Sequence, residues 1–69
     1  MTQMDIFNNL EKEITAVILT ANGKSSLTYF TMDGEVIKAG WIQKSSIPSI
    51  AYKLINLGYK NLYRSAMAN

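Results

Sequence analysis

The sequence predicts one small α+β domain, with a short N-terminal helix, a three-stranded antiparallel meander, a C-terminal helix and a further short segment after it. Three observations predict this fold. Two Gly-containing turn dipeptides lie eleven residues apart, runs rich in β-branched residues flank them, and apolar residues with helical spacing follow. A chain of 69 residues forms one domain at most, so residues 1–69 are taken as a single interaction domain.

The first segment, residues 5–13, has apolar residues that recur at spacings of three and four, as on one side of a helix. Met4, Phe7, Leu10 and Ile14 form this stripe, and Thr2 or Asp5 could cap the helix. A helix of two to three turns is too short to persist without packing on another element.

The meander is expected from two turns. Residues 14–20 are rich in β-branched residues and precede Asn22-Gly23, whose side chains suit the positive φ angles of a type I′ turn. Strands 27–32 and 35–42 are separated by Asp33-Gly34 in the same way. Two-residue loops at both turns would pair Ala21 with Lys24 and Met32 with Glu35.

A C-terminal helix is expected from Ser45 or Ser46 as N-cap, with Pro48 in the first turn and Gly58 after the last turn. Apolar residues between them recur with helical spacing. Residues 59–64 are either a fourth strand or a continuation of the helix, and the strand is favoured. Residues 66–69 are expected to fray.

Both faces of the expected sheet carry apolar residues, although a meander with one hydrated face should alternate apolar and polar positions. Lys38 and Tyr29 fall opposite each other, and their face is the better candidate for exposure because Lys is rarely buried without a partner. The alternative is that this face packs under the N-terminal helix, with Lys38 and Tyr29 at its rim. A face left uncovered would meet a second copy or another macromolecule.

The composition argues against an enzyme and against a bound metal or cofactor. The chain has no Cys and no His, so it lacks the strongest nucleophile, the commonest general base and the usual zinc ligands. Asp33 and Glu35 flank a predicted turn, where Asp is favoured for its backbone preferences. We therefore expect no catalytic residues, no cofactor and no metal site.

The chain is also expected to be cytosolic and free of the membrane. Its longest mostly apolar run, residues 14–21, is less than half of the about 20 residues that cross a bilayer. The first residues lack the basic and apolar regions of a secretory signal, and the absence of Cys fits a reducing compartment.

Charge and aromatic residues give two candidate partners. Residues 1–21 carry a net charge of −2 and residues 22–69 carry +4. Basic residues interleaved with aromatic ones suit nucleic acid, whereas Tyr and Trp are also enriched at protein interfaces. The candidate partner-binding residues are Tyr29, Lys38, Trp41, Lys44, Tyr59, Lys60, Tyr63 and Arg64.

The expected order helix, three strands, helix resembles that of the double-stranded-RNA-binding domain family. That family has a lysine cluster at the start of its second helix, whereas residues 44–49 contain one Lys, so the resemblance is one of element order alone. The function expected first is therefore protein binding, by self-association or by inhibition or regulation of a larger partner, as in small phage or mobile-element proteins. Nucleic-acid binding through the basic C-terminal half is the alternative.

Overall fold

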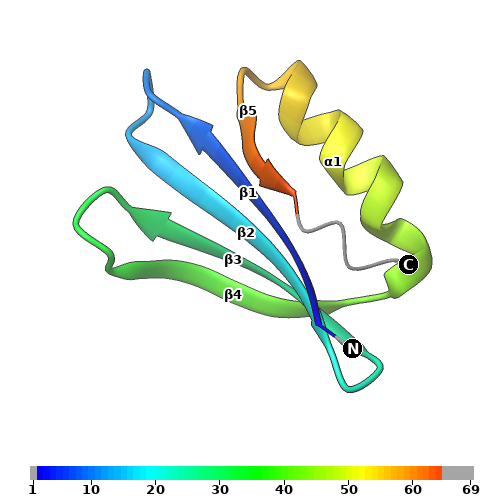
Figure 1. The fold of residues 1–69 in the computed structure, drawn as a ribbon. Coiled ribbons are helices and arrows are strands. Elements are labelled where there is room, and N and C mark those ends of the chain that lie inside the picture. The colour runs from blue at the N-terminus through cyan, green and yellow to red at the C-terminus, as the bar shows by residue number, and fades with distance from the viewer. Residues whose placement is uncertain (1, 65–69) are drawn as a thin grey trace.

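The computed structural model describes residues 2–64, without the side chain of Arg64, as a five-stranded antiparallel sheet with one helical segment packed on it (Figure 1). The expectation for residues 66–69 lies outside this range. The strands are β1 (Gln3–Asn9), β2 (Ile14–Ala21), β3 (Lys24–Thr31), β4 (Val36–Ile42) and β5 (Lys60–Arg64). The short 3-10 helix η1 (Lys44–Ser46) leads into the helix α1 (Ile47–Asn56). The strand order is β4-β3-β2-β1-β5.

The predicted N-terminal helix is wrong, because its residues form β1 and the turn after it. Asp5, Phe7 and Asn9 are buried and the residues between them are half-buried, which is the two-residue period of a strand. The alternation lies in the burial and not in the residue types, since Asp5 and Asn9 are polar and Ile6 and Phe7 are adjacent. Pairing of all seven β1 residues with β2 supplies hydrogen bonds that a short isolated helix could not match. Without that helix, the element order no longer resembles the double-stranded-RNA-binding domain.

The predicted meander is confirmed as β2, β3 and β4. Asn22 and Gly23 both have positive φ, 54° and 77°, and Ala21 pairs with Lys24 as the two-residue turn requires. The register of β3 with β4 is also as expected from Ser25 to Tyr29, so that Tyr29 pairs with Lys38.

The second turn differs from the expectation by one residue. The Gly34 amide donates to the Thr31 carbonyl (3.0 Å) and the Thr31 amide donates to the Glu35 carbonyl (2.8 Å), so the loop contains Met32, Asp33 and Gly34. Gly34 has φ 92°, the geometry of a three-residue loop closed by a glycine bulge. Phe30 therefore pairs with Val36, and a shift in the pairing between Tyr29 and Phe30 restores the expected register from Tyr29 to Ser25.

The C-terminal helix and the fourth strand of the prediction are confirmed as α1 and β5. Gly58 adopts φ 99°, and the amides of Gly58 and Tyr59 donate to the carbonyls of Ile55 (3.1 Å) and Leu54 (3.0 Å). This pair of bonds is a Schellman motif, which ends the helix and turns the chain back toward the sheet. β5 then pairs with β1, so the segment between β4 and β5 crosses the sheet.

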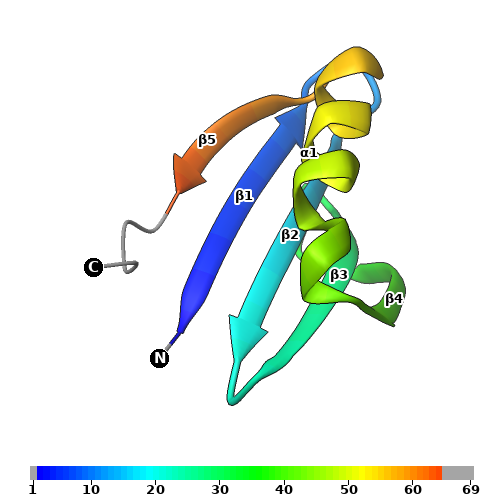
Figure 2. The ribbon, with the colours of Figure 1, turned by 90° about the vertical axis from the view of Figure 1, so that its right-hand side faces the viewer.

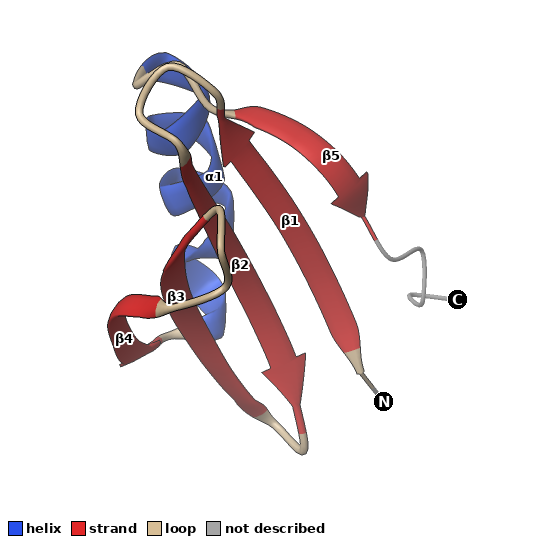
Figure 3. Cartoon of the chain, turned by 90° about the vertical axis from the view of Figure 1, so that its left-hand side faces the viewer, coloured by secondary structure: helices blue, strands red, loops and turns tan. Residues whose placement is uncertain are grey.

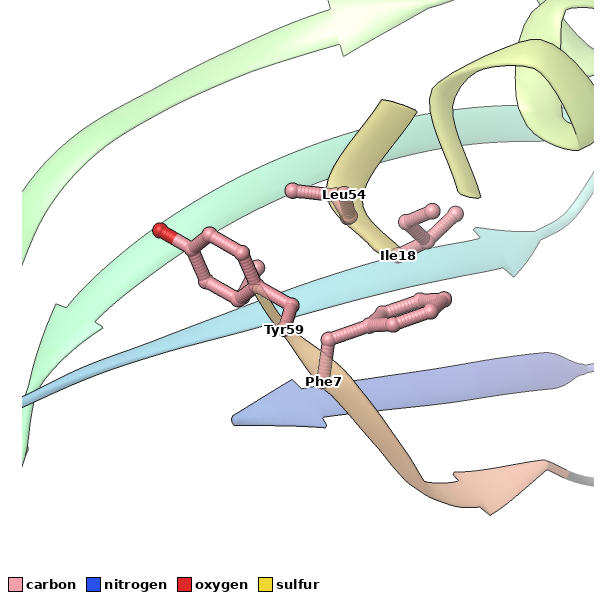
Figure 4. Packing of buried hydrophobic residues seen from close by; sticks show 5 residues of the cluster. Phe7, Ile18, Leu54 and Tyr59 are labelled. Carbon is pink, nitrogen blue, oxygen red and sulfur yellow. The ribbon is translucent and has the colours of Figure 1, made fainter. Parts of the chain in front are cut away.

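α1 lies over one face of the sheet, as Figure 2 shows from the helix side. The core between them contains Phe7 from β1, Ala16 and Ile18 from β2, Leu54 from α1 and Tyr59 before β5 (Figure 4). Ile14, Leu27, Tyr29 and Ile42 extend the core along the sheet. We call this side of the sheet the covered face.

Asn9 links the first turn to the helix end, and this role was not foreseen from the sequence. Its side chain is 2 % exposed, accepts from the Lys12 amide (3.0 Å) and donates to the Leu57 carbonyl (3.3 Å). One buried amide thus satisfies both a loop donor and a carbonyl at the C-terminus of α1, where carbonyls lack helical partners.

Candidate functional site: the open face of the sheet

No helix or strand among residues 2–64 packs on the sheet face opposite α1. One side chain from the β3–β4 turn lies over part of it, since the Met32 sulfur is 4.0 Å from Asn8 Nδ2 and 3.8 Å from Thr15 Oγ1. Figure 3 shows this face, with the helix behind the strands. We call it the open face. Its residues follow from the pairing registers, because directly paired residues point to the same side of a sheet.

Three neighbouring rows across the strands make up most of the open face. The middle row crosses all five strands, and the row on each side of it contains one aromatic residue in β3 or β4. The middle row is Tyr63, Ile6, Val17, Thr28 and Ala39. The row toward the β2–β3 turn is Met4, Leu19, Ser26 and Trp41. The row toward the other turns is Lys60, Asn8, Thr15, Phe30 and Val36.

Exposure is greatest toward the two edges of this face. Trp41 on β4 is 74 % exposed and Tyr63 on β5 is 50 % exposed, whereas Ile6, Val17 and Phe30 on the inner strands are half-buried by their neighbours. The rows are mostly apolar, with Lys60 as their charged member. Such a surface is unusual on a small monomer, where large apolar patches mark interaction sites.

The two ends of the open face differ in charge. The β1–β2 and β3–β4 turns lie at the same end of the sheet. The first contains Glu11, Lys12 and Glu13, and the second contains Asp33, with Glu35 next to it. The opposite end has the β2–β3 turn, where Lys24 lies over Trp41 with its ammonium 5.8 Å from the ring centroid. The open face is therefore bounded by a basic end and by an acidic end, where four carboxylates outnumber Lys12 and Lys60.

A shallow hollow at the basic end brings Lys24, Trp41 and Lys44 together. Gly23, Ser25, Ile42 and Gln43, from the β2–β3 turn and the end of β4, complete its lining. Trp41 and Lys44 were predicted as partner-binding residues, and the structure places both here. Lys24 was missed, since nothing in the sequence says that a turn lysine lies over the only Trp of the chain.

The preference for an exposed Lys38 and Tyr29 face is wrong. Tyr29 is half-buried and packs against the core under α1, while Lys38 is exposed at the rim of the same face. The alternative expectation is correct in that this face packs under a helix, but the helix is the C-terminal α1 and not an N-terminal one. The lysine is tolerated because β4 is an edge strand.

The remaining predicted residues divide between core, open face and edge. Tyr59 is 6 % exposed and belongs to the core, so it is not available to a partner. Lys60 and Tyr63 lie on the open face in β5, opposite Asn8 and Ile6. The backbone of Arg64 pairs with Asp5, and its side chain lies outside the described part of the chain.

Burial also accounts for a pKa shift in the core. Desolvation raises the pKa of the Tyr59 hydroxyl above its ordinary value, and the neighbouring Tyr29 adds to the effect. Within residues 2–64 no group of three or more carboxylates gathers into a possible metal site. No helix in that range is both long and apolar enough to cross a bilayer.

Comparison of the chain with protein-family models, curated proteins and solved structures found no match.

Proposed function

We propose that this protein is a non-catalytic binding module that recognises another polypeptide through the open face of its sheet. The observation that carries the proposal is that α1 packs on one face, while the other presents two mostly apolar rows and a third, more polar one, with Trp41 74 % exposed at one edge. Burial of apolar and aromatic area is the main favourable term in protein association. A sheet that is apolar on both faces fits a function in which the second face is covered by a partner.

The chain's chemistry supports binding rather than catalysis. Asp33 and Glu35, a pair of carboxylates close in the sequence, lie in and next to the β3–β4 loop, where Glu35 takes part in the backbone hydrogen bonds of the loop. With neither His nor Cys, the open face offers no strong base or nucleophile. A cytosolic location, expected from the composition, belongs to the same proposal.

Nucleic acid is the second candidate, and one observation favours it. Lys24, Trp41 and Lys44 gather in one hollow, and a ring beside cations can stack on a base while the cations meet phosphates. The acidic turns at the other end of the sheet count against it, because a strand of nucleic acid running along the face would meet Glu11, Glu13, Asp33 and Glu35.

Site-specific photo-crosslinking in cells tests the proposed function. A benzophenone amino acid replaces Thr28, at the centre of the open face, and in a matched control it replaces Tyr52, which is 72 % exposed on α1. We expect the probe at Thr28 to join a polypeptide that mass spectrometry identifies, and the probe at Tyr52 not to do so. Nuclease-sensitive products from the Thr28 probe, or the same products from both positions, would contradict protein binding through this face.

A further inference from the structure

We infer that the polypeptide bound to the open face is a second copy of this chain, stacked face to face with its strands antiparallel to those of the first. The inference rests on the proposed function and specifies the partner. In this arrangement two sheets enclose an apolar layer, and the two α1 helices lie outside, as in a sandwich of two sheets. Three observations support it: the size of the core, the area of the face and the placement of its charges.

The core of one copy is small. The fully buried apolar side chains among residues 2–64 are Phe7, Ala16, Ile18, Leu54 and Tyr59, all on the helix side of the sheet. Chains of this size often need a disulfide, a metal or a second subunit to be stable. Because the chain has no Cys, a disulfide is excluded, and a second subunit would add a second apolar layer.

The open face is large enough for a stable dimer. Five strands spaced by about 4.8 Å, each about seven residues long with a rise of about 3.3 Å, cover roughly 550 Å² in projection. The accessible area of such a face exceeds its projection because side chains stand above it. The smallest specific interfaces bury about 600 Å² per partner, so the face is sufficient only if most of it is used.

The charges of the open face select the antiparallel arrangement. A two-fold axis that runs across the strands places β4 over β4 and brings the acidic end of each copy to the basic end of the other. The β3–β4 turn, with Asp33 and Glu35, then approaches Lys24 and Lys44 of the second copy. An axis along the strands would instead bring acidic turns onto acidic turns, which repel. A self-complementary patch of this kind is what an isologous dimer requires.

Edge pairing offers a different dimer, and the structure disfavours it. β4 and β5 are the two edge strands, and each has a register irregularity, β4 opposite Tyr29 and Phe30 and β5 opposite Ile6 and Phe7. Lys38 also lies in the middle of β4. Bulges and edge lysines are the devices by which proteins prevent edge-to-edge association, so the face is the better dimer surface.

Sedimentation equilibrium from about 1 µM to about 1 mM tests the inference. We expect the mass to rise from 7.7 kDa toward twice that value. Thr28→Lys places an unpaired ammonium at the centre of the interface and should weaken association at least about 100-fold. Lys38→Glu, on the same sheet but on the covered face, is the control and should leave the mass profile unchanged.

A charge exchange tests the orientation and does not depend on the folding of a core variant. Lys24→Glu, in an exposed turn, should weaken the dimer roughly five- to tenfold, and adding Asp33→Lys should restore it. A monomer at every concentration would overturn the inference while leaving crosslinking to another polypeptide as the test of the proposed function. A dimer that is insensitive to Thr28→Lys, or that Asp33→Lys does not restore, would also overturn it.

Discussion

The ammonium of Lys24 lies 5.8 Å from the centroid of the Trp41 ring, so the only Trp of the chain is covered on one side by a cation from the neighbouring strand. Trp41 is nevertheless 74 % exposed. A cation over an exposed ring contributes about 0.5–1 kcal/mol. The contact therefore orients the ring at the edge of the open face without burying it.

Replacing Lys24 by Ala should accordingly cost the monomer less than about 1 kcal/mol of unfolding free energy. Urea denaturation of the Thr28→Lys background measures this without a contribution from association. Lys44→Ala removes a neighbouring lysine that makes no such ring contact, and it serves as the control. A loss of more than about 2 kcal/mol in Lys24→Ala would mean that the lysine has a structural role that the ring contact does not explain.

Truncation of the central helix residue should have a far larger effect. Leu54 is 2 % exposed between α1 and the sheet, and Leu54→Ala should cost about 2–5 kcal/mol because it leaves a cavity. Ile55, next to it and 48 % exposed, supplies the control, since Ile55→Ala should cost less than about 1 kcal/mol. Equal losses for the two variants in chemical denaturation would show that α1 does not pack on the sheet as described.

A buried hydroxyl pair beside the β2–β3 turn should behave as a unit. The hydroxyls of Thr20 and Ser25 lie 2.8 Å apart, and both residues are buried at positions that pair across β2 and β3. Thr20→Val leaves the Ser25 hydroxyl without its partner and should cost about 1–3 kcal/mol. The double variant Thr20→Val, Ser25→Ala should cost less than the sum of the single variants, and strict additivity in denaturation would argue against the bond.

Stability should fall at alkaline pH because of Tyr59. Burial, with a smaller contribution from Tyr29, raises the pKa of its hydroxyl above the ordinary 10.0. The unfolded chain therefore loses this proton first, so the stabilisation is complete below the ordinary value and is lost as the pH rises through the raised pKa. Tyr59→Phe should flatten this part of the stability–pH curve, whereas Tyr52→Phe on the exposed side of α1 should not. An unchanged alkaline fall in Tyr59→Phe would contradict the assignment.

Local signals in the sequence were enough to predict most of the fold. Asn22-Gly23 accepts positive φ at both positions and so determined the β2–β3 turn and its register, while Gly58 marked the end of α1. The β1 segment could not be predicted in this way, because its apolar residues do not alternate with polar ones: Ile6 and Phe7 are adjacent, and the buried Asp5 and Asn9 are polar. Pairing with β2 makes this segment a strand, and that contact is not local.

The open face was harder to predict than the fold, for a related reason. Which face α1 would cover depends on the crossing from β4 to β5, and no local pattern encodes that crossing. Lys38 indicated the wrong face as exposed, because a lysine on an edge strand reaches solvent from the covered face as well. Trp41, predicted to bind a partner, lies on this face, whereas Lys24 became a candidate only through its contact with the Trp41 ring.

The emission spectrum of Trp41 tests most directly whether a second copy covers the open face. Trp41 is the only Trp, so its emission reports on this surface alone. We predict emission typical of a buried indole at about 500 µM, a shift to longer wavelength on dilution to about 1 µM, and water-like emission throughout for Thr28→Lys. A water-like spectrum that is the same at every concentration, in the unmodified chain as in Thr28→Lys, would contradict the account.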